Sequence, residues 1–142
     1  MSSFHYAFAI LDISRTRDFY VEQIGCTEGR STEHWIDFEL FGHQLSRPIW
    51  GQPGGAFCEG LVDGHAVPIP HFDVILGIEE FWSLAERLCS AGIRFLMEPG
   101  LRFIGKPGEQ ATMFFLDPDH NAIEFKAFVR ADEMFASAKG PF

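Results

Sequence analysis

The sequence predicts an α+β protein in which two βαβββ modules form a cupped mixed sheet. Strand-like and helix-like patterns follow one another in the same order twice, and a segment rich in glycine and proline separates the two series. Short sequence matches also recur between them. The chain, at 142 residues, has the length of one ordinary domain. We expect this single domain to comprise module one (about 4–49), a linker (about 50–69), module two (about 70–128) and a C-terminal tail (129–142).

Module one begins with a strand over 4–11, where bulky and smaller apolar side chains alternate. Ser14 is a suitable N-cap for a short helix, and Gly25 stands where a left-handed residue would end it. Gly42 supplies a turn between two later strands. The expected strands after the helix cover 26–34, 35–41 and 43–49.

Module two begins with an alternating strand over 71–76, after a connecting loop over 50–70. The helix that follows has apolar residues at three-and-four spacing, and Gly92 ends the pattern. Its inner stripe contains Ile78, Phe81, Trp82, Ala85, Leu88 and Cys89. Strands over 93–97, 112–116 and 121–128 complete the module, with a turn at 117–120.

Composition excludes several function classes. The net charge is −9 and no basic run is present, so a nucleic-acid partner is not expected. No apolar stretch has the length of a membrane helix, and the first residues do not resemble a secretory signal. The three cysteines form no CxxC pair, which favours reduced thiols. We therefore expect a cytoplasmic protein that does not associate with membranes.

Three side chains are candidates for a divalent-metal site. His5 and His71 occupy the same position in the first strands of the two modules, 66 residues apart. Glu124 alternates with Ala122 and Lys126, opposite apolar neighbours, so its carboxylate points away from the helix-covered face. A set of two histidines and one carboxylate suits Fe(II), and also accepts Mn, Zn or Ni. Each residue alone is more often a surface or core residue, or an ion-pair partner; their joint placement favours the site.

These patterns resemble the vicinal-oxygen-chelate superfamily, which contains glyoxalase I, extradiol dioxygenases, and fosfomycin- and bleomycin-resistance proteins. The resemblance extends from Phe4 to about Phe128 and implies the glyoxalase/extradiol dioxygenase fold. It also implies that His5, His71 and Glu124 are the metal ligands. The motifs that carry it are His5-Tyr6-Ala7-Phe8, Asp18-Phe19-Tyr20, Phe41-Gly42-His43-Gln44-Leu45, His71-Phe72 and, most specifically, Asp117-Pro118-Asp119-His120-Asn121-Ala122-Ile123-Glu124-Phe125.

Two departures from the family pattern bear on the reaction. Glyoxalase I usually has a carboxylate at the first-module counterpart of Glu124, which here is Ser46; Gln44 is a possible additional metal ligand. Dioxygenases usually have a histidine acid/base and a tyrosine at the open metal positions, and the catalytic group is unknown here. His43 and His65 are weak candidates for it, and His120 is expected to serve a left-handed turn.

The leading hypothesis is a metal-dependent enzyme, most plausibly dioxygenase-like, acting on a small compound that is chelated through adjacent oxygens. An aromatic substrate is one option, since Trp35 and many of the sixteen Phe residues are available to line a pocket. The alternatives are a binding or resistance protein without catalysis, and a glyoxalase- or lyase-type enzyme. We expect a homodimer, with each metal site either within one chain or shared by two chains.

Overall fold

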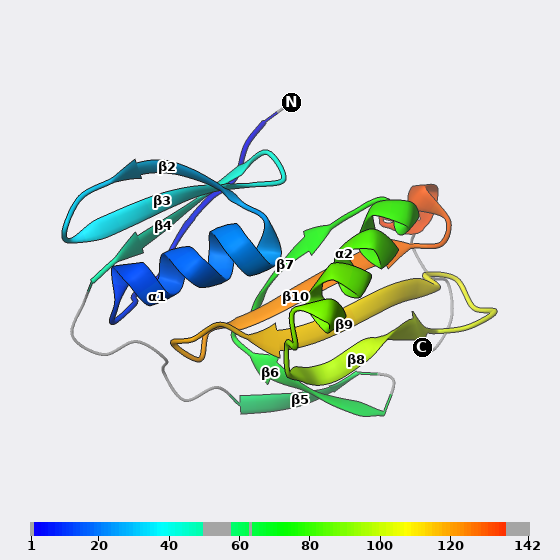
Figure 1. The fold of residues 1–142 in the computed structure, drawn as a ribbon. Coiled ribbons are helices and arrows are strands. Elements are labelled where there is room, and N and C mark those ends of the chain that lie inside the picture. The colour runs from blue at the N-terminus through cyan, green and yellow to red at the C-terminus, as the bar shows by residue number, and fades with distance from the viewer. Residues whose placement is uncertain (1, 50–57, 63, 136–142) are drawn as a thin grey trace. The chain divides into compact units, whose positions relative to one another are not determined.

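The structure is a computed structural model that describes residues 2–49, 58–62 and 64–135 (Figure 1). The chain forms two compact units, and each is described by itself. Unit 1 comprises Met1–Ala56 and Leu116–Asn121, and unit 2 comprises Phe57–Phe115 and Ala122–Phe142.

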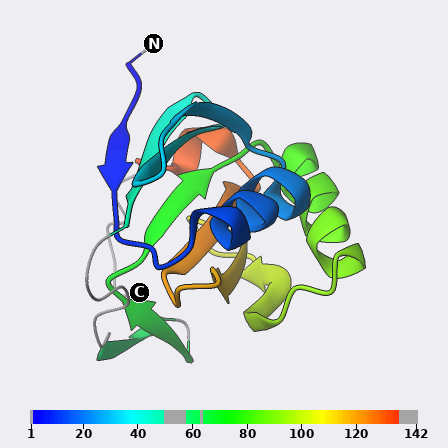
Figure 2. The ribbon, with the colours of Figure 1, turned by 60° about the vertical axis from the view of Figure 1, so that its left-hand side comes forward.

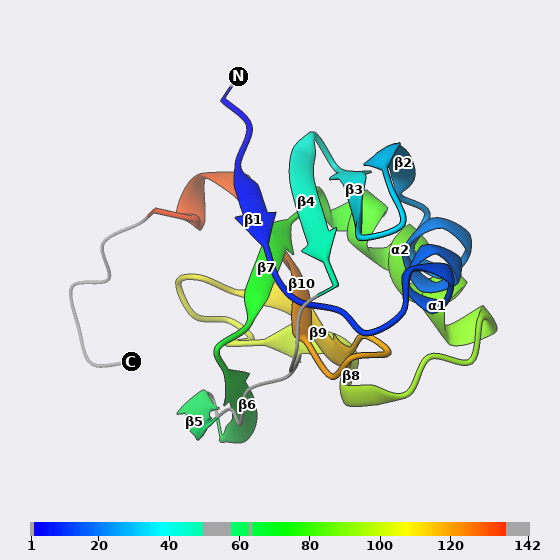
Figure 3. The ribbon, with the colours of Figure 1, turned by 90° about the vertical axis from the view of Figure 1, so that its left-hand side faces the viewer.

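Unit 1 contains a mixed four-stranded sheet in the order β1-β4-β3-β2 (Figure 3). β1 pairs in parallel with β4, and the other neighbours are antiparallel. Phe41 and Gly42 both have positive φ, of 49° and 85°, as the two-residue turn between β3 and β4 requires. The strands are β1 (His5–Ala7), β2 (Thr27–Ser31), β3 (Trp35–Leu40) and β4 (His43–Pro48).

The first strand is shorter than the sequence predicts. The backbone still runs beside β4 beyond Ala7, because the Phe8 and Ile10 N–H groups donate to the carbonyls of Ser46 and Pro48 at 3.1 and 3.0 Å. Only the isolated bridge between Ile10 and Ile49 continues the strand pairing there.

The first helix begins at Ile13 rather than after Ser14, so the predicted N-cap was wrong. Asp12 is the N-cap, and its carboxylate accepts a 2.7 Å hydrogen bond from the Arg15 N–H. A carboxylate at this position also complements the positive end of the helix dipole. The helix α1 (Ile13–Arg17) continues as the π-helical segment η1 (Asp18–Ile24), which ends at Gly25 with φ 95°, as predicted.

The helical segment packs its apolar side on the sheet of unit 1. Tyr20 is fully buried and its ring stacks on that of Phe38, with 5.1 Å between centroids. Ile36, Phe38 and Leu40 are all buried, which is every second residue of β3. Alternation then directs Asp37 to the opposite face of the sheet.

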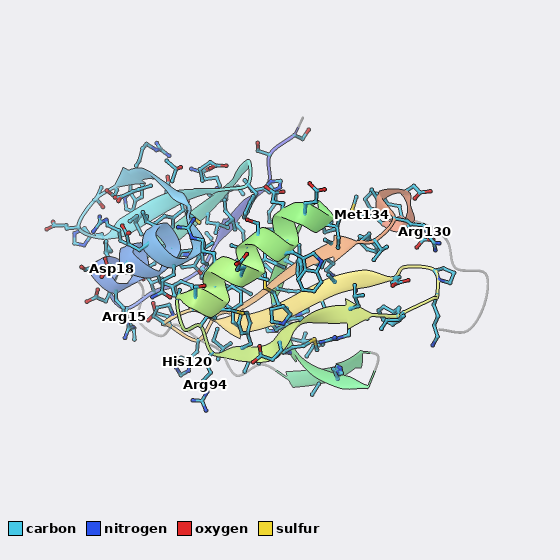
Figure 4. The ribbon with its side chains drawn as sticks, turned by 45° about the vertical axis from the view of Figure 1, so that its right-hand side comes forward. Arg15, Asp18, Arg94, His120, Arg130 and Met134 are labelled. Carbon is cyan, nitrogen blue, oxygen red and sulfur yellow. The ribbon has the colours of Figure 1, made fainter. Side chains whose placement is uncertain are left out.

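Unit 2 repeats the same topology, with the strand order β7-β10-β9-β8 (Figure 1). β7 and β10 are parallel, and α2 (Ile78–Ser90) lies across one face of the sheet (Figure 4). The two mixed sheets confirm the predicted fold class of paired βαβββ modules. The strands are β7 (Phe72–Ile75), β8 (Phe95–Arg102), β9 (Gln110–Leu116) and β10 (Ala122–Phe128).

The inner stripe of α2 differs in part from the prediction. Phe81, Ala85 and Leu88 are buried as expected, whereas Cys89 is exposed and Trp82 is 42% exposed. Leu84 is buried instead, since it lies one turn from Phe81 and Leu88 on the same side. None of the described helices is long and apolar enough to cross a membrane.

The segment between the repeated sheets contains a hairpin. β5 (Cys58–Val62) and β6 (His65–Ile69) are antiparallel, and the chain passes from β6 into β7 (Figure 2). Gly64, with φ 75°, lies in its turn. The glycine and proline content of this segment had indicated a loop, but Pro is compatible with a strand in a two-stranded hairpin. Residues 50–57 of the predicted linker and 136–142 of the tail lie outside the described residues.

The turn between β9 and β10 belongs to unit 1. Asp117 accepts hydrogen bonds from the Asp119 and Asn121 N–H groups at 2.9 and 2.8 Å, and from the buried Tyr20 hydroxyl at 2.9 Å. Arg15 forms a 2.7 Å ion pair with Asp119. His120 has φ 64°, which confirms the predicted left-handed turn residue.

Candidate metal centre

In unit 2, the structure brings together two of the three predicted metal ligands. His71 immediately precedes β7, and Glu124 lies on the parallel neighbour β10. The distance between His71 Nε2 and Glu124 Oε2 is 3.2 Å. Their side chains are 25% and 6% exposed, so the carboxylate is held inside the unit and the ring lies at its boundary.

The tautomer of neutral His71 follows from its second contact. Nδ1 lies 2.6 Å from the carbonyl oxygen of Pro68, which can only accept a hydrogen bond. Nδ1 is therefore the protonated nitrogen of the neutral ring, and Nε2 directs its lone pair toward Glu124. The ring is also fixed edge-on against Phe114, with 4.9 Å between centroids. A backbone carbonyl behind one ring nitrogen is the support that metal-binding histidines commonly have.

The electrostatics of this pair favour an anionic carboxylate and a basic imidazole. The hydrogen bond that protonated His71 donates from Nε2 to the Glu124 carboxylate is the main cause that raises the pKa of His71 above its ordinary value, and the Pro68 carbonyl adds to it. Burial alone would raise the pKa of Glu124, but bonds and charges from His71, Lys126 and Thr112 outweigh burial and lower it. In the metal-free protein, His71 therefore holds its second proton more tightly than a free imidazole does, and Glu124 holds its proton less tightly than a free carboxyl does.

Lys126 is a second cation at the same carboxylate. Its Nζ lies 3.3 Å from Glu124 Oε2 and 2.7 Å from Asp73 Oδ2. Burial lowers the pKa of Lys126, and the bond to Asp73 and the Glu124 charge outweigh this effect, so the pKa is raised. Lys126 therefore remains charged, and its ammonium group pairs with both Asp73 and Glu124.

In unit 1, His5 takes part in a hydrogen-bond chain on the face opposite the helix. His5 Nδ1 is 2.9 Å from Gln44 Oε1, and Gln44 Nε2 is 3.0 Å from Asp37 Oδ2. A carboxylate without a proton only accepts, so the NH₂ end of Gln44 must face Asp37. The amide oxygen then faces His5, which donates from Nδ1 and keeps its lone pair on Nε2. Both predicted histidine ligands thus present Nε2.

Asp37 is a site residue that the sequence analysis missed. It is 4% exposed and accepts a 2.5 Å hydrogen bond from Ser46 Oγ, its partner across β3 and β4. Arg30 approaches the same carboxylate at 3.4 Å. A cavity of about 310 Å³ in unit 1 is lined by Asp37, Gln44, His43 and Arg30, among others.

The strand registers confirm the internal repeat. Ala7 pairs with Ser46 on β1 and β4, and Asp73 pairs with Glu124 on β7 and β10. Because Ala7 and Asp73 each lie two residues after a predicted histidine ligand, Ser46 is the counterpart of Glu124. In unit 2 a hydroxyl again faces the carboxylate, since Thr112 Oγ1 donates to Glu124 Oε1 at 2.6 Å. The carboxylate lies on the third strand of unit 1 (β3) and the hydroxyl on the fourth (β4), whereas in unit 2 the hydroxyl lies on β9 and the carboxylate on β10.

The two weak acid/base candidates have other surroundings. His43 Nδ1 accepts a 3.0 Å hydrogen bond from the Phe4 N–H, which holds the N-terminal segment beside β4. His65 is exposed at the start of β6. Neither residue is bonded to His5, His71 or Glu124 among the contacts described.

The donor set fits a divalent ion at His71 and Glu124. Ligands bonded to one ion at about 2.1 Å and roughly right angles are about 3 Å apart, and the Nε2–Oε2 distance is 3.2 Å. Over the described residues, no group of three or more His, Cys, Asp or Glu side chains is close enough to hold a metal ion. Unit 2 therefore brings two of the candidate ligands together, and a three-ligand site would need one more from outside this pair.

Comparisons with known proteins identify the family. The family model of the Glyoxalase/Bleomycin resistance protein/Dioxygenase superfamily matches residues 3–125. The chain belongs to this superfamily. A comparison with curated proteins gave no match.

Solved structures share this fold. A glyoxalase/bleomycin resistance protein/dioxygenase from Alicyclobacillus acidocaldarius is 27% identical, with a TM-score of 0.77 over 94% of this chain and 96% of that chain. A glyoxalase/dioxygenase from Nostoc punctiforme is 17% identical, with a TM-score of 0.64 over 91% and 92%. The fosfomycin resistance protein FosX from Listeria monocytogenes is 17% identical, with a TM-score of 0.61 over 94% and 95%. The last two support the fold alone.

Ser46 occupies a position that is informative within this superfamily. Ser46 was predicted to stand where glyoxalase I usually has a carboxylate, and the strand register confirms that Ser46 is the counterpart of Glu124. Asp37 provides a carboxylate on the adjacent strand, bonded to the Ser46 hydroxyl. The chain thus has an acidic group on this face of unit 1, on the strand next to that of Ser46.

Proposed function

We propose that this protein is a metal-dependent enzyme of the vicinal-oxygen-chelate type, with His71, Glu124 and His5 as ligands. The observation that carries the proposal is the arrangement of His71, whose Nδ1 is bonded to the Pro68 carbonyl and whose Nε2 lies 3.2 Å from Glu124 Oε2. A bound divalent ion, Fe(II) by preference, would polarise two adjacent oxygens of a small substrate.

The residues of unit 2 would position and shield such a substrate. Thr112 and Lys126 fix the Glu124 carboxylate from two sides, so its orientation does not depend on the ligand. Phe114 holds the His71 ring and lines the adjacent cavity together with Met97. A dioxygenase-like reaction is our first proposal, with glyoxalase- or lyase-type chemistry as the alternative within the same site class.

The position of Lys126 supports a second candidate function, which is binding of a small molecule without catalysis. Its ammonium group already neutralises Glu124 Oε2, the oxygen that faces His71, so the carboxylate is satisfied without a metal. A protein that binds a small molecule without catalysis, as bleomycin-resistance proteins do on this fold, would need no more than this. Metal content separates the two functions.

The test is the metal stoichiometry of protein purified without chelator. We expect about one divalent ion per chain, and at least roughly tenfold weaker binding in Glu124→Gln and His71→Ala. The exposed pair Glu33 and His34 has a similar separation of 3.3 Å, so His34→Ala is the matched control and should leave binding unchanged. Full metal retention in both site variants would refute the assignment, and absence of metal in the wild type would favour the binding protein.

A further inference from the structure

A cavity of about 130 Å³ in unit 2 lies beside the His71–Glu124 pair and contains an additional cation, Arg102. The apolar part of its lining includes Phe114, Phe103 and Met97. This volume is smaller than the roughly 300–1,000 Å³ of sites that enclose drug-sized ligands, so only a small molecule, or one part of a larger one, fits.

One cation that lines this cavity has no carboxylate partner over the ranges that the structure describes. Glu124 is paired with His71 and Lys126, and Lys126 is paired also with Asp73. Arg102 forms no ion pair within the described part of the chain, although the protein as a whole has a net charge of −9. Among the described residues, Arg102 is therefore a cation of this cavity with no carboxylate within ion-pair distance.

Backbone contacts hold the Arg102 guanidinium in place. Nη1 donates to its neighbour's carbonyl, that of Leu101, at 3.0 Å, and Nη2 is 3.4 Å from the Glu98 carbonyl. Gly100 leaves room for the group, because a Cβ there would lie 2.9 Å from Nη1. Nε is buried and has no hydrogen-bond partner among the described residues. Two carbonyls accept from a guanidinium that has five N–H groups, so donors of Arg102 remain for an anionic group.

We propose that Arg102 binds an oxyanion group of the ligand, and that the ligand of this site is a small aromatic compound with a carboxylate. The oxyanion would satisfy the free donors of Arg102, the ring would contact Phe114 and Met97, and polar oxygens would reach the His71–Glu124 pair. This inference rests on the proposed function for the position of the ligand, but the contribution of Arg102 is measurable without metal.

The first experiment uses chelator-treated protein with benzoate and benzyl alcohol as probes, which differ in charge and share the ring. We expect benzoate to bind at least about tenfold more tightly, since hydrogen bonds to charged groups contribute more than neutral ones. Arg102→Gln should abolish this preference. Arg94→Gln is the matched control, because Arg94 is an exposed arginine of the same unit whose side chain projects away from the sheet (Figure 4).

A conservative variant covers the case in which Arg102→Gln does not fold. Arg102→Lys keeps the charge but loses the planar fork, so the preference for benzoate should fall several-fold without disappearing. An unchanged preference in either variant, or equal binding of the two probes by the wild type, would overturn the proposal.

The second experiment separates this inference from the proposed function. With Mn(II) added, catechol and 3,4-dihydroxybenzoate offer the same adjacent oxygens, and only the second has a carboxylate. Tighter binding of 3,4-dihydroxybenzoate that depends on Arg102 supports both proposals. If the protein prefers benzoate in the absence of metal and does not bind added Mn(II), the proposed function is refuted and the Arg102 site is still supported.

Discussion

Asp37 and His5 lie on opposite sides of one amide group, that of Gln44, and both of its ends are bonded to them. The carboxylate of Asp37 fixes the direction of the amide, and the amide fixes the tautomer of His5. A buried acid thus determines which nitrogen a histidine two strands away presents, although the acid does not touch the ring.

The first prediction concerns this tautomer. In wild-type protein at about pH 8, ring ¹⁵N shifts of His5 should show the proton on Nδ1. Asp37→Asn should give a mixture of tautomers, because an asparagine both donates and accepts and no longer fixes Gln44. Ser46→Ala, which removes another hydrogen bond to Asp37, should leave the tautomer unchanged.

A second substitution tests the same chain of hydrogen bonds by rescue. Adding Gln44→Glu to Asp37→Asn places an acceptor-only group beside His5 and should restore the proton to Nδ1. A wild-type His5 that carries its proton on Nε2 would contradict the orientation derived for Gln44.

The second prediction is the pH dependence of the metal-free His71–Glu124 pair. The pKa of His71 is raised, so its contribution to stability is complete below the unfolded value of about 6.5 and is lost as pH rises through the folded pKa. The pKa of Glu124 is lowered, so its contribution is present above the unfolded value and is lost as pH falls through the folded pKa. The pair should stabilise the fold most between about pH 4.5 and 6.5.

Urea unfolding and an NMR titration measure this effect. Glu124→Gln should destabilise the metal-free protein more at about pH 5.5 than at about pH 8.5, and the His71 midpoint should fall. The exposed Glu33 is the matched control, since Glu33→Gln removes an ion pair that water already screens. A wild-type His71 midpoint below about 6.5 would show that the bond to Glu124 does not form.

The third prediction assigns His120 a conformational role. A left-handed backbone costs an L-residue about 1–2 kcal/mol, and glycine avoids this cost. His120→Gly should therefore raise the free energy of unfolding by up to about 1 kcal/mol, while His34→Gly should lower it or leave it unchanged. Loss of activity in a stable His120→Gly protein would show that the imidazole is needed for chemistry.

The fourth prediction concerns the origin of the third ligand. We propose a homodimer, in which His5 comes from the same chain as His71 and Glu124 or from the second chain. Mixing His5→Ala with Glu124→Gln distinguishes these arrangements. Shared sites give a hybrid with one intact and one doubly damaged site, so metal binding should reappear. Hybrid dimers confirmed by mass without restored binding would exclude sharing.

Periodicity was sufficient to predict α2 and the order of strands and helices along each repeated module, because both depend on which face of an element is apolar. The N-cap of the first helix and the β5–β6 hairpin depend on local hydrogen bonds, which periodicity does not predict. Asp12 displaced Ser14 as the N-cap because its carboxylate reaches the Arg15 N–H, and backbone pairing made a hairpin from the glycine-rich β5–β6 segment.

Asp37 could have been found from the sequence by counting strand register. The two-residue turn at Phe41 and Gly42 pairs Leu40 with His43, and three further positions along each strand pair Asp37 with Ser46. The internal repeat leads only to Ser46, since a repeat relates each position to its counterpart in the other module and not to its neighbour across the sheet. The contacts of Arg102 with backbone carbonyls have no comparable sequence signal.

The turn at Leu116–Asn121 bears on how proteins of this kind recombine. It is encoded within the second repeat, yet Asp117 and Asp119 serve as acceptors for Tyr20 and Arg15 of the first. A fragment ending near residue 56 would lose the partner of a buried tyrosine hydroxyl. The two repeats therefore depend on each other, and chimeras between relatives should tolerate a crossover only when Tyr20 and the Asp117 turn come from the same parent protein.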